Sequence, residues 1–354
     1  MSNADDRPAA GVPRRPTMKD VAALAGVSLK TVSRVVNDEP LVSEDASMKV
    51  HTAVLQLGFH PDERAGNLRR AGRKTDTIGL VVSSVANPFA ASVNRAIENA
   101  ATTRGVALFA SSMDDDPERE QPAVDALLRR RVDGLILTTV RKSQGYLLAE
   151  QSYGTPFVFV DREPIGIEAD AVVSDHATGA ATATRHLIER GHRRIAYLGD
   201  RSDIQSARER HRGFARELGN AGISSLDGPV MVDIHDDAVA EETTMNLLSA
   251  NNRPTAIFSS QNLITVGVLR ALRRLGLQHS IALVGFDDIP MADLLEPGIT
   301  VVAQHPESIG ALAADRLFAR LDGDTQPPRT FIVPTTLIPR GSGEIAPQEP
   351  PAGR

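Results

Sequence analysis

Lys30 and Arg34 are two cations whose spacing in this sequence could serve a specific chemistry. They are four residues apart, so they share one side of the chain if the segment is a helix. Lysine and arginine side chains can donate hydrogen bonds to the O6 and N7 atoms of guanine. The hydroxyls of Thr31 and Ser33 suit phosphate oxygens, which fix register without reading sequence. The alternative is that Lys30 and Arg34 are ordinary solvated charges on a helix surface.

The elements that must position these side chains are two short helices joined by a tight turn, over residues 18–37. Before Gly26, apolar residues recur at helical spacing, namely Val21, Ala22, Leu24 and Ala25. Ser28 stands where an N-cap belongs, ahead of a second helix whose inner side carries Val32, Val35 and Val36. This outline fits a helix-turn-helix, whose second helix enters the major groove of DNA.

A third helix is predicted to start at Ser43 and to end at Gly58. Its apolar face would close a three-helix core and would consist of Val50, Val54, Leu55 and Leu57. We therefore assign residues 17–60 to a helix-turn-helix domain. Residues 1–16 are polar and rich in proline, and we expect them to be disordered.

The bulk composition excludes several classes of protein. The 354 residues include no cysteine, so neither disulfides nor cysteine-ligated zinc can stabilise the fold. The first 16 residues contain no apolar core of a signal peptide, and no run of about 18 apolar residues occurs. We expect a soluble, cytoplasmic protein with no membrane partner.

The net charge of −6 is unevenly distributed. Residues 14–74 carry eleven Lys/Arg and seven Asp/Glu, whereas residues 75–354 carry a net charge of −9. A basic N-terminal part on an acidic body suits a protein that contacts phosphates at one end only. An uneven solvated surface is the alternative interpretation.

From Thr77 the sequence alternates short apolar runs with amphipathic stretches. The expected strands are 78–83, 107–112, 134–139, 157–160, 194–199, 230–234, 256–260 and 282–286. The expected helices between them include 89–103, 123–130, 178–190, 207–218 and 266–275. This pattern predicts parallel sheets covered on both faces, arranged as two doubly wound α/β subdomains, with ligands at the carboxyl ends of the strands. We expect the tail, residues 341–354, to be disordered.

An ordered set of motifs resembles the LacI–GalR family of bacterial transcription regulators. The set begins with residues 19–37 and continues with 78–82, 87–89, 116–120, 131–136, 186–196, 210–214 and 284–289. The resemblance implies dimers, a body like that of periplasmic sugar-binding proteins, and an effector between two subdomains of the body (75–340). Subdomain 1 would span about 75–174 and 304–332, and subdomain 2 about 175–303 and 333–340.

By this resemblance, Leu29, Lys30 and Arg34 are the positions that meet base edges. Residues 61–74 correspond to the family's hinge helix and linker, in which Asn67 and Leu68 would contact DNA. Leu68 would be wedged into the minor groove at the operator centre. A plain linker is the alternative. The sequence departs from the family at Ala46, Ser47, Asp62 and Gly66, so we expect a hinge that orders only when the body holds it in place.

Polar residues at predicted strand ends are candidates for the effector site. Asp161 and Asp287 each close an apolar strand, and by resemblance Arg210 and Asp287 are the principal effector ligands. A surface salt bridge is the alternative role for either residue. The remaining candidates are Phe89, Ser206, His235 and Gln261. Since tryptophan is absent and Phe89 can pack against a sugar ring, we expect a sugar or sugar derivative rather than a purine.

We therefore expect a DNA-binding regulator, most simply a repressor, that binds a palindromic operator as a homodimer. The alternative is a cytoplasmic sugar receptor without operator-specific DNA binding. We expect neither enzymatic activity nor a cofactor, because the dinucleotide and phosphate-loop glycine fingerprints are missing. We also predict no metal site. The run 114–116 is acidic, and we expect it to begin a helix rather than to bind a cation.

Overall fold

The computed structural model describes residues 16–36, 42–57, 59, 75–224 and 228–348. The chain forms two compact units, residues 1–75 and 76–354. The predictions for Asn67, Leu68 and the rest of the hinge segment lie outside the described residues.

The first unit contains the three predicted helices, α1 (Met18–Ala25), α2 (Leu29–Val36) and α3 (Glu44–Leu57). The turn after α1 needs glycine, because Gly26 has a φ of 64°. Ser28 caps α2 as predicted, since its Oγ accepts a hydrogen bond from the Thr31 amide at 3.1 Å. The helices enclose a small core of Val21, Val32, Val35, Val50, Ala53 and Phe59.

The prediction for one core residue of this unit is wrong. Leu55 is 83% exposed, whereas Val50, Val54 and Leu57 contribute to the core. These three residues follow the i, i+4, i+7 spacing of one helical face, and Leu55 lies off that face.

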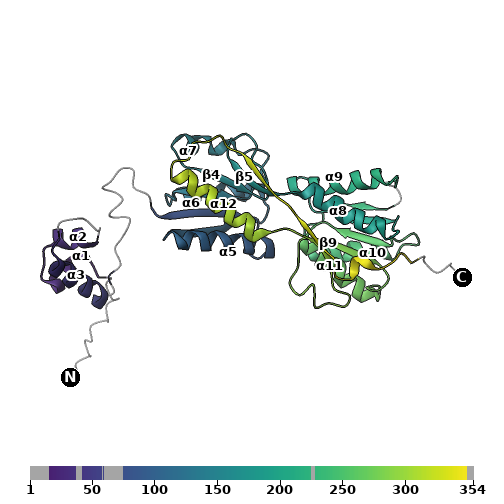
Figure 1. Cartoon of the computed structure of the whole chain (residues 1–354), viewed down its shortest axis with the longest axis horizontal. Coiled ribbons are helices and arrows are strands. Elements are labelled where there is room, and N and C mark those ends of the chain that lie inside the picture. The colour runs from purple at the N-terminus through teal and green to yellow at the C-terminus, as the bar shows by residue number, and fades with distance from the viewer. Residues whose placement is uncertain (1–15, 37–41, 58, 60–74, 225–227, 349–354) are drawn as a thin grey trace, which may run out of the picture. The chain divides into compact units, whose positions relative to one another are not determined.

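The second unit is built on two six-stranded sheets (Figure 1). Sheet A has the order β11-β5-β4-β3-β1-β2 and every pairing in it is parallel. Its strands are β1 (Thr77–Val82), β2 (Ala107–Ser112), β3 (Gly134–Leu137), β4 (Phe157–Val160), β5 (Asp170–Ser174) and β11 (Thr330–Val333).

Sheet B has the order β12-β10-β9-β8-β6-β7, and only its edge pair β10–β12 is antiparallel among the pairings described. Its strands are β6 (Ile195–Leu198), β7 (Val230–Met231), β8 (Ala256–Ser259), β9 (Ala282–Phe286), β10 (Thr300–Ala303) and β12 (Thr336–Ile338). We call the sheet A lobe subdomain 1 and the sheet B lobe subdomain 2.

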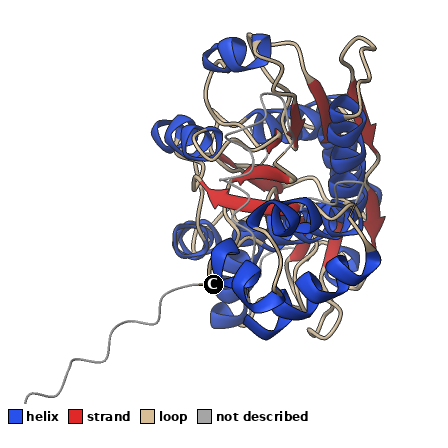
Figure 2. Ribbon diagram, turned by 90° about the vertical axis from the view of Figure 1, so that its left-hand side faces the viewer, coloured by secondary structure: helices blue, strands red, loops and turns tan. Residues whose placement is uncertain are grey.

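Helices cover both faces of each sheet (Figure 2). On sheet A, α5 (Pro88–Thr103) and α12 (Pro306–Leu321) cover one face, and α6 (Pro117–Leu128) packs on the other. On sheet B, α8 (His176–Glu189) and α9 (Gln205–Asn220) cover one face, and α10 (Asp237–Leu248) and α11 (Asn262–Leu275) the other. The predicted arrangement of two covered parallel-sheet subdomains is confirmed. No helix among the described residues is long and apolar enough to cross a membrane.

The sequence-based prediction missed four strands, β5, β10, β11 and β12. Each is only three to five residues long, and β11 alternates between exposed and half-buried positions at the sheet edge. The helix expected at 123–130 begins six residues earlier, because Asp116 caps it through the Glu118 amide (2.9 Å) and Pro117 occupies its first position.

The chain passes between the subdomains three times, after β5, after β10 and between β11 and β12. These crossings are bonded to one another. The Asp175 amide donates to Val333 O at 3.0 Å, and His305 Nε2 lies 2.9 Å from Thr336 Oγ1. Three adjacent connections restrict the relative motion of the two subdomains more than one linker would.

The prediction that the whole tail is disordered is wrong for residues 341–348. Ser342–Glu344 form a short 3₁₀ helix against subdomain 2. Ser342 Oγ donates to Leu283 O at 2.7 Å, and His186 Nε2 lies 2.5 Å from Glu344 Oε1. His192 Nε2 lies 2.8 Å from Ile345 O. These long-range contacts order a segment whose composition resembles a disordered one.

The close approach of α8 and α9 yields a stability prediction. A Cβ at Gly213 would lie 2.1 Å from Ala177 O, whereas a Cβ at Gly219, on the same helix, would meet nothing within 4 Å. Gly213→Ala must push the helices apart and should lower the free energy of unfolding by about 1–3 kcal/mol. Gly219→Ala should raise it by about 0.5–1 kcal/mol through helix propensity. Urea unfolding followed by circular dichroism measures both, and equal effects would contradict the packing argument.

Candidate functional site

The first turn of α2 presents three of the predicted DNA-contacting residues, Leu29, Lys30 and Thr31. Leu29 is 46% exposed and Lys30 is also exposed, while Val32 and Val35 face the core. Thr31 Oγ1 lies 2.9 Å from Ser28 Oγ, so its hydroxyl is tied to the cap of the helix. Ser33 and Arg34 are half-buried. The helix therefore presents one aliphatic and one cationic side chain at its N-terminal end.

In the body, the predicted polar residues gather where the two sheets present their carboxyl ends to each other. Asp161 follows β4 and Asp287 follows β9, and both are buried. Both also have left-handed backbones, with φ of 67° and 69°. Such conformations are unfavourable outside glycine and cluster at functional sites.

Arg210 is the centre of this cluster. Its Nη1 donates to Ser260 O at 2.7 Å and lies 3.9 Å from Asp287 Oδ2. Its guanidinium carbon lies 4.1 Å from the centroid of the Phe286 ring. The side chain is buried, so one carboxylate, one carbonyl and one aromatic face replace its hydration.

His176 connects Arg210 to Asp161. Arg210 Nε donates to His176 Nδ1 at 3.3 Å, and since an arginine can only donate, Nδ1 must be the acceptor. The ring proton then lies on Nε2, which is 3.3 Å from Asp161 O. Burial, and then the positive charge of Arg210, holds the pKa of His176 well below its usual range. His176 is a neutral link between Asp161 at the end of β4 and Arg210 on α9.

Asp161 and Phe89 share a small pocket in subdomain 1. The pocket lies between the ends of β1, β3 and β4 and the start of α5, and Thr138 also lines it. Burial raises the pKa of the Asp161 carboxyl, against the opposing charges of Arg162 and Arg210. An aromatic face beside a carboxylate suits a ligand with one apolar side and several hydroxyls.

Arg162 is a site residue that the sequence analysis missed. It is buried, its Nη1 donates to Asp115 Oδ1 at 2.7 Å and to Thr139 O at 2.9 Å, and its Nε lies 3.3 Å from Asp161 Oδ2. Its position directly after Asp161 at a strand end was the available signal. Gln304 was also missed, and its Nε2 donates to Asp287 Oδ1 at 2.5 Å.

The other predicted effector residues lie around this centre in different roles. The Gln261 Oε1 accepts from the Leu263 and Ile264 amides, so it caps α11. Ser206 is buried in the first turn of α9, and His235 Nδ1 lies 2.8 Å from Asp200 Oδ1. Asn262, beside Gln261, exchanges two hydrogen bonds with Asn87 of subdomain 1, at 3.0 and 3.3 Å.

The acidic run 114–116 begins a helix, as predicted. Asp116 is the N-cap of α6, and Asp115 pairs with Arg162. Among the described residues, no group of three or more His, Asp or Glu side chains is arranged to hold a metal ion.

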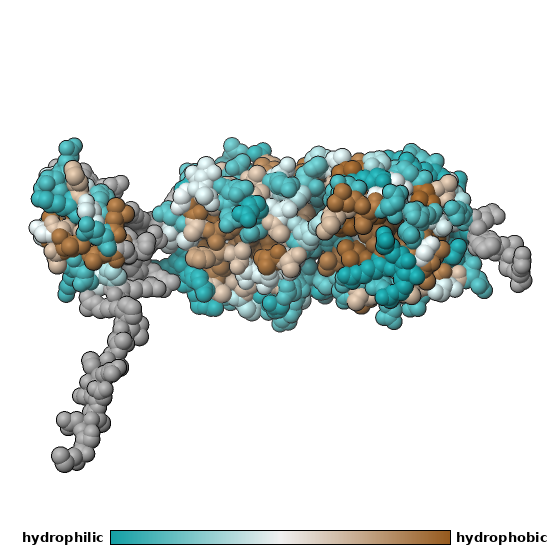
Figure 3. Space-filling view, turned by 90° about the horizontal axis from the view of Figure 1, so that it is seen from below, coloured by the Kyte–Doolittle hydropathy of each residue, from teal (hydrophilic) through white to brown (hydrophobic). Residues whose placement is uncertain are grey.

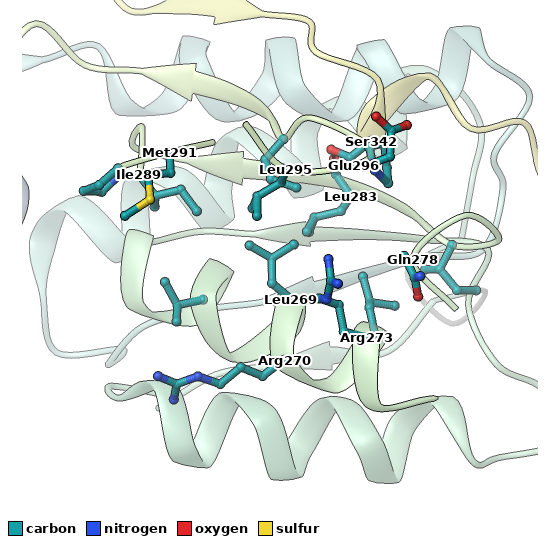
Figure 4. A pocket seen from close by; sticks show the side chains of 16 residues that line it. Leu269, Arg270, Arg273, Gln278, Leu283, Ile289, Met291, Leu295, Glu296 and Ser342 are labelled. Carbon is teal, nitrogen blue, oxygen red and sulfur yellow. Dashed lines mark hydrogen bonds between the residues drawn. The ribbon is translucent and has the colours of Figure 1, made fainter. Parts of the chain in front are cut away.

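Apolar side chains are visible on the surface of both subdomains (Figure 3). In subdomain 2 they line a groove of about 320 Å³ between α11 and residues 289–299. Leu269 and Leu295 lie on opposite sides of this groove, with Met291 near one end and Arg270 and Arg273 on α11 (Figure 4). Met291 is 67% exposed. The groove is separate from the cluster around Arg210.

Each of the two units matches a known protein family. Residues 17–62 match the model of bacterial regulatory proteins of the lacI family, and residues 184–343 match a periplasmic binding protein-like domain. The ribose operon repressor of Escherichia coli K12 is 33% identical over 92% of this chain and 99% of that protein.

Two solved structures are similar over the body and, in one case, over nearly the whole chain. The lac repressor dimer bound to operator and the anti-inducer ONPF has a TM-score of 0.81 at 28% identity, covering 93% of this chain and 99% of that one. A ribose-bound LacI family regulator from Enterococcus faecium has a TM-score of 0.70 at 25% identity, covering 77% and 100%. With a helix-turn-helix unit, a two-lobed body and relatives of this identity and coverage, the chain belongs to the LacI family of bacterial regulatory proteins.

Proposed function

We propose that this protein is a sequence-specific transcriptional repressor whose operator affinity is controlled by a small sugar-like effector. The observation that supports the proposal is that one chain contains both an α2 helix with Leu29 and Lys30 exposed and a buried polar cluster around Arg210. The relative named above is an operon repressor, and we propose no catalytic role. Because the target is chromosomal DNA, we place its action in the cytoplasm.

The polar cluster supports a sugar as the effector class. Asp161 and Asp287 can accept from hydroxyls, Arg162 and Arg210 can donate to them, and Phe89 can cover an apolar ring face. We assign Ser206, Gln261 and His235 to the surroundings of the same site. D-Ribose is the first probe, because ribose occurs in the names of a relative and of a similar structure.

Control of DNA binding requires that the effector bind two arrangements of the subdomains unequally. The Asn87–Asn262 pair joins the subdomains at the site, and a change in their relative position would break it. A ligand that stabilises or breaks this arrangement would change the spacing of the two DNA-binding units in a dimer.

The apolar groove of subdomain 2 is the surface we assign to a second copy of this chain. The similar lac repressor structure is a dimer, and the groove combines exposed Met291 with Arg270, Arg273 and Glu296 (Figure 4). Apolar contacts flanked by charges of both signs suit a self-complementary interface.

For DNA reading, Arg34→Ala should remove about 1–3 kcal/mol of discrimination between operator and scrambled DNA, because a base contact is lost. The operator is first selected from a random duplex pool with the full-length protein. Fluorescence anisotropy at fixed salt then gives the affinities. Lys49→Ala is the control, since it removes an equal charge from the exposed face of α3, where Lys49 pairs with Asp45. Equal selectivity in the wild type and Arg34→Ala would refute the base contact. Recovery of no preferred sequence would favour the sugar receptor instead.

For effector binding, Asp287→Asn should lower D-ribose affinity at least about tenfold while leaving operator binding intact, because a buried charged acceptor is lost. Isothermal titration measures the affinity for D-ribose. Fluorescence anisotropy with operator DNA measures operator binding and its release by ribose. The matched control is Asp288→Asn, which changes the neighbouring exposed carboxylate that pairs with Arg340. If the wild type ignores ribose, a panel of pentoses and hexoses is tested with the same variants. A response that survives Asp287→Asn would show that the cluster is not the effector site.

For assembly, Met291→Glu should convert the dimer to a monomer, because it buries a charge in the apolar groove. Light scattering coupled to size exclusion measures the mass. Tyr153→Glu is the control, since Tyr153 is 81% exposed in subdomain 1, outside the groove. A Met291→Glu dimer of unchanged stability would place the interface elsewhere.

A further inference from the structure

Asp115 lies where loops from both subdomains meet. It belongs to the loop after β2, and its carboxylate accepts from Arg162 of the same subdomain at 2.7 Å. Its backbone carbonyl accepts from Arg201 Nη1 of subdomain 2 at 2.7 Å. Asp114 and Asp115 both have left-handed backbones, with φ of 54° and 50°. Two successive strained residues persist only where the surrounding contacts hold them.

His235 approaches the same carboxylate from subdomain 2. Its Nδ1 lies 2.8 Å from Asp200 Oδ1, and its Nε2 lies 4.0 Å from Asp115 Oδ2. Since Asp200 can only accept as a carboxylate, Nδ1 carries a proton. A second proton on Nε2 gives an imidazolium between two carboxylates, one from each subdomain.

We propose that Asp115 and His235 form a proton-dependent latch between the two subdomains. Protonated His235 attracts Asp115 across the boundary between the subdomains, and neutral His235 does not. The proposal concerns the relative position of the subdomains. Its effect on operator binding rests on the proposed function, but the latch itself does not.

The groups that face His235 determine whether its attraction to Asp115 strengthens or weakens as the pH rises. Its own subdomain supplies Asp200 and Arg201, and subdomain 1 supplies Asp115, whose carboxylate is shared with Arg162. The hydrogen bond to Asp200 raises the pKa of His235, and burial and Arg201 oppose this. The attraction to Asp115 is therefore fully present at low pH and is lost as the pH rises through the raised pKa of His235.

Other contacts between the subdomains involve groups that do not titrate between about pH 6 and pH 8. They include the Asn87–Asn262 amide pair and the hydrogen bond from the Glu163 amide to Gln205 Oε1 (2.9 Å). The bond from Arg201 to Asp115 O is equally insensitive. We call the arrangement in which these contacts are made the joined arrangement. The contacts fix its geometry, and protonation of His235 makes the population of this arrangement depend on pH.

The test measures the distance between the subdomains directly. The chain has no cysteine, so Tyr153→Cys and Ala215→Cys place one spin label on each subdomain. Pulsed electron paramagnetic resonance on full-length protein, diluted with unlabelled chain, gives the distance distribution without sugar or DNA. The ratio of joined to separated arrangements should fall about fivefold between pH 6 and pH 8, as expected for one partly exposed ion pair.

The variants separate the latch from other titrations. In His235→Asn the ratio should be the same at both pH values, and Asp115→Asn should also lose most of the response. His279→Asn removes an exposed histidine of subdomain 2 and should respond as the wild type does. If Asp115→Asn does not fold, His235→Asn alone decides. A wild type without a pH response, or a His235→Asn variant that keeps it, would overturn the proposal.

The same variants show how the latch relates to the proposed function. If ribose binds the joined arrangement, the affinity of the wild type for ribose should be higher at pH 6 than at pH 8. The affinity of His235→Asn for ribose should be the same at both pH values. Absence of ribose binding at both pH values would count against the proposed effector and leave the distance measurement unaffected.

Discussion

Burial of the Arg210 guanidinium is the constraint on which the polar cluster between the two sheets depends. A guanidinium taken out of water must keep its hydrogen bonds and a counter-charge, or its burial costs several kcal/mol. The chain meets this requirement with Ser260 O, Asp287 and a His176 ring that stays neutral. Each partner comes from a different element, so β8, β9, α8 and α9 must all be in place before the charge is accommodated. The polar cluster around Arg210 and the core of subdomain 2 therefore depend on each other.

Much of this could be predicted from the sequence, because its strongest signals are local. Runs such as Phe157–Val160 are buried on both faces, and continuous apolar runs indicate parallel strands inside a layered fold. Ser28 and Gly26 mark helix boundaries through backbone chemistry that acts over a few residues. Asp161 and Asp287 could each be placed at the carboxyl edge of a parallel sheet, because ligands of such sheets bind there. That the two residues, from different sheets, lie near each other was implied only by the family resemblance.

What could not be predicted depends on contacts between distant parts of the chain. The tail has the composition of a disordered segment, and contacts with distant residues such as His186, His192 and Leu283 order its residues 341–348. The position of Arg162 directly after Asp161 marked it as a candidate, but its pairing with Asp115, in another loop, could not be read from the local sequence. The Asn87–Asn262 pair likewise joins residues from different subdomains. Short edge strands such as β11 have too few residues for alternation to be recognised.

The order of elements along the chain also has a consequence for biosynthesis. The apolar face of sheet A that carries Ile78 and Leu80 is covered by α12 as well as α5, and α12 comes after nearly all of sheet B. During translation, the ribosome must therefore make most of subdomain 2 before subdomain 1 can be completed. Until then, sheet A lacks its β11 edge and part of its helical cover. Chains with such non-local pairings fold slowly, and apolar surface stays exposed until the later elements have been made. Part of the apolar face of sheet A is thus exposed to solvent on the nascent chain until α12 has been made.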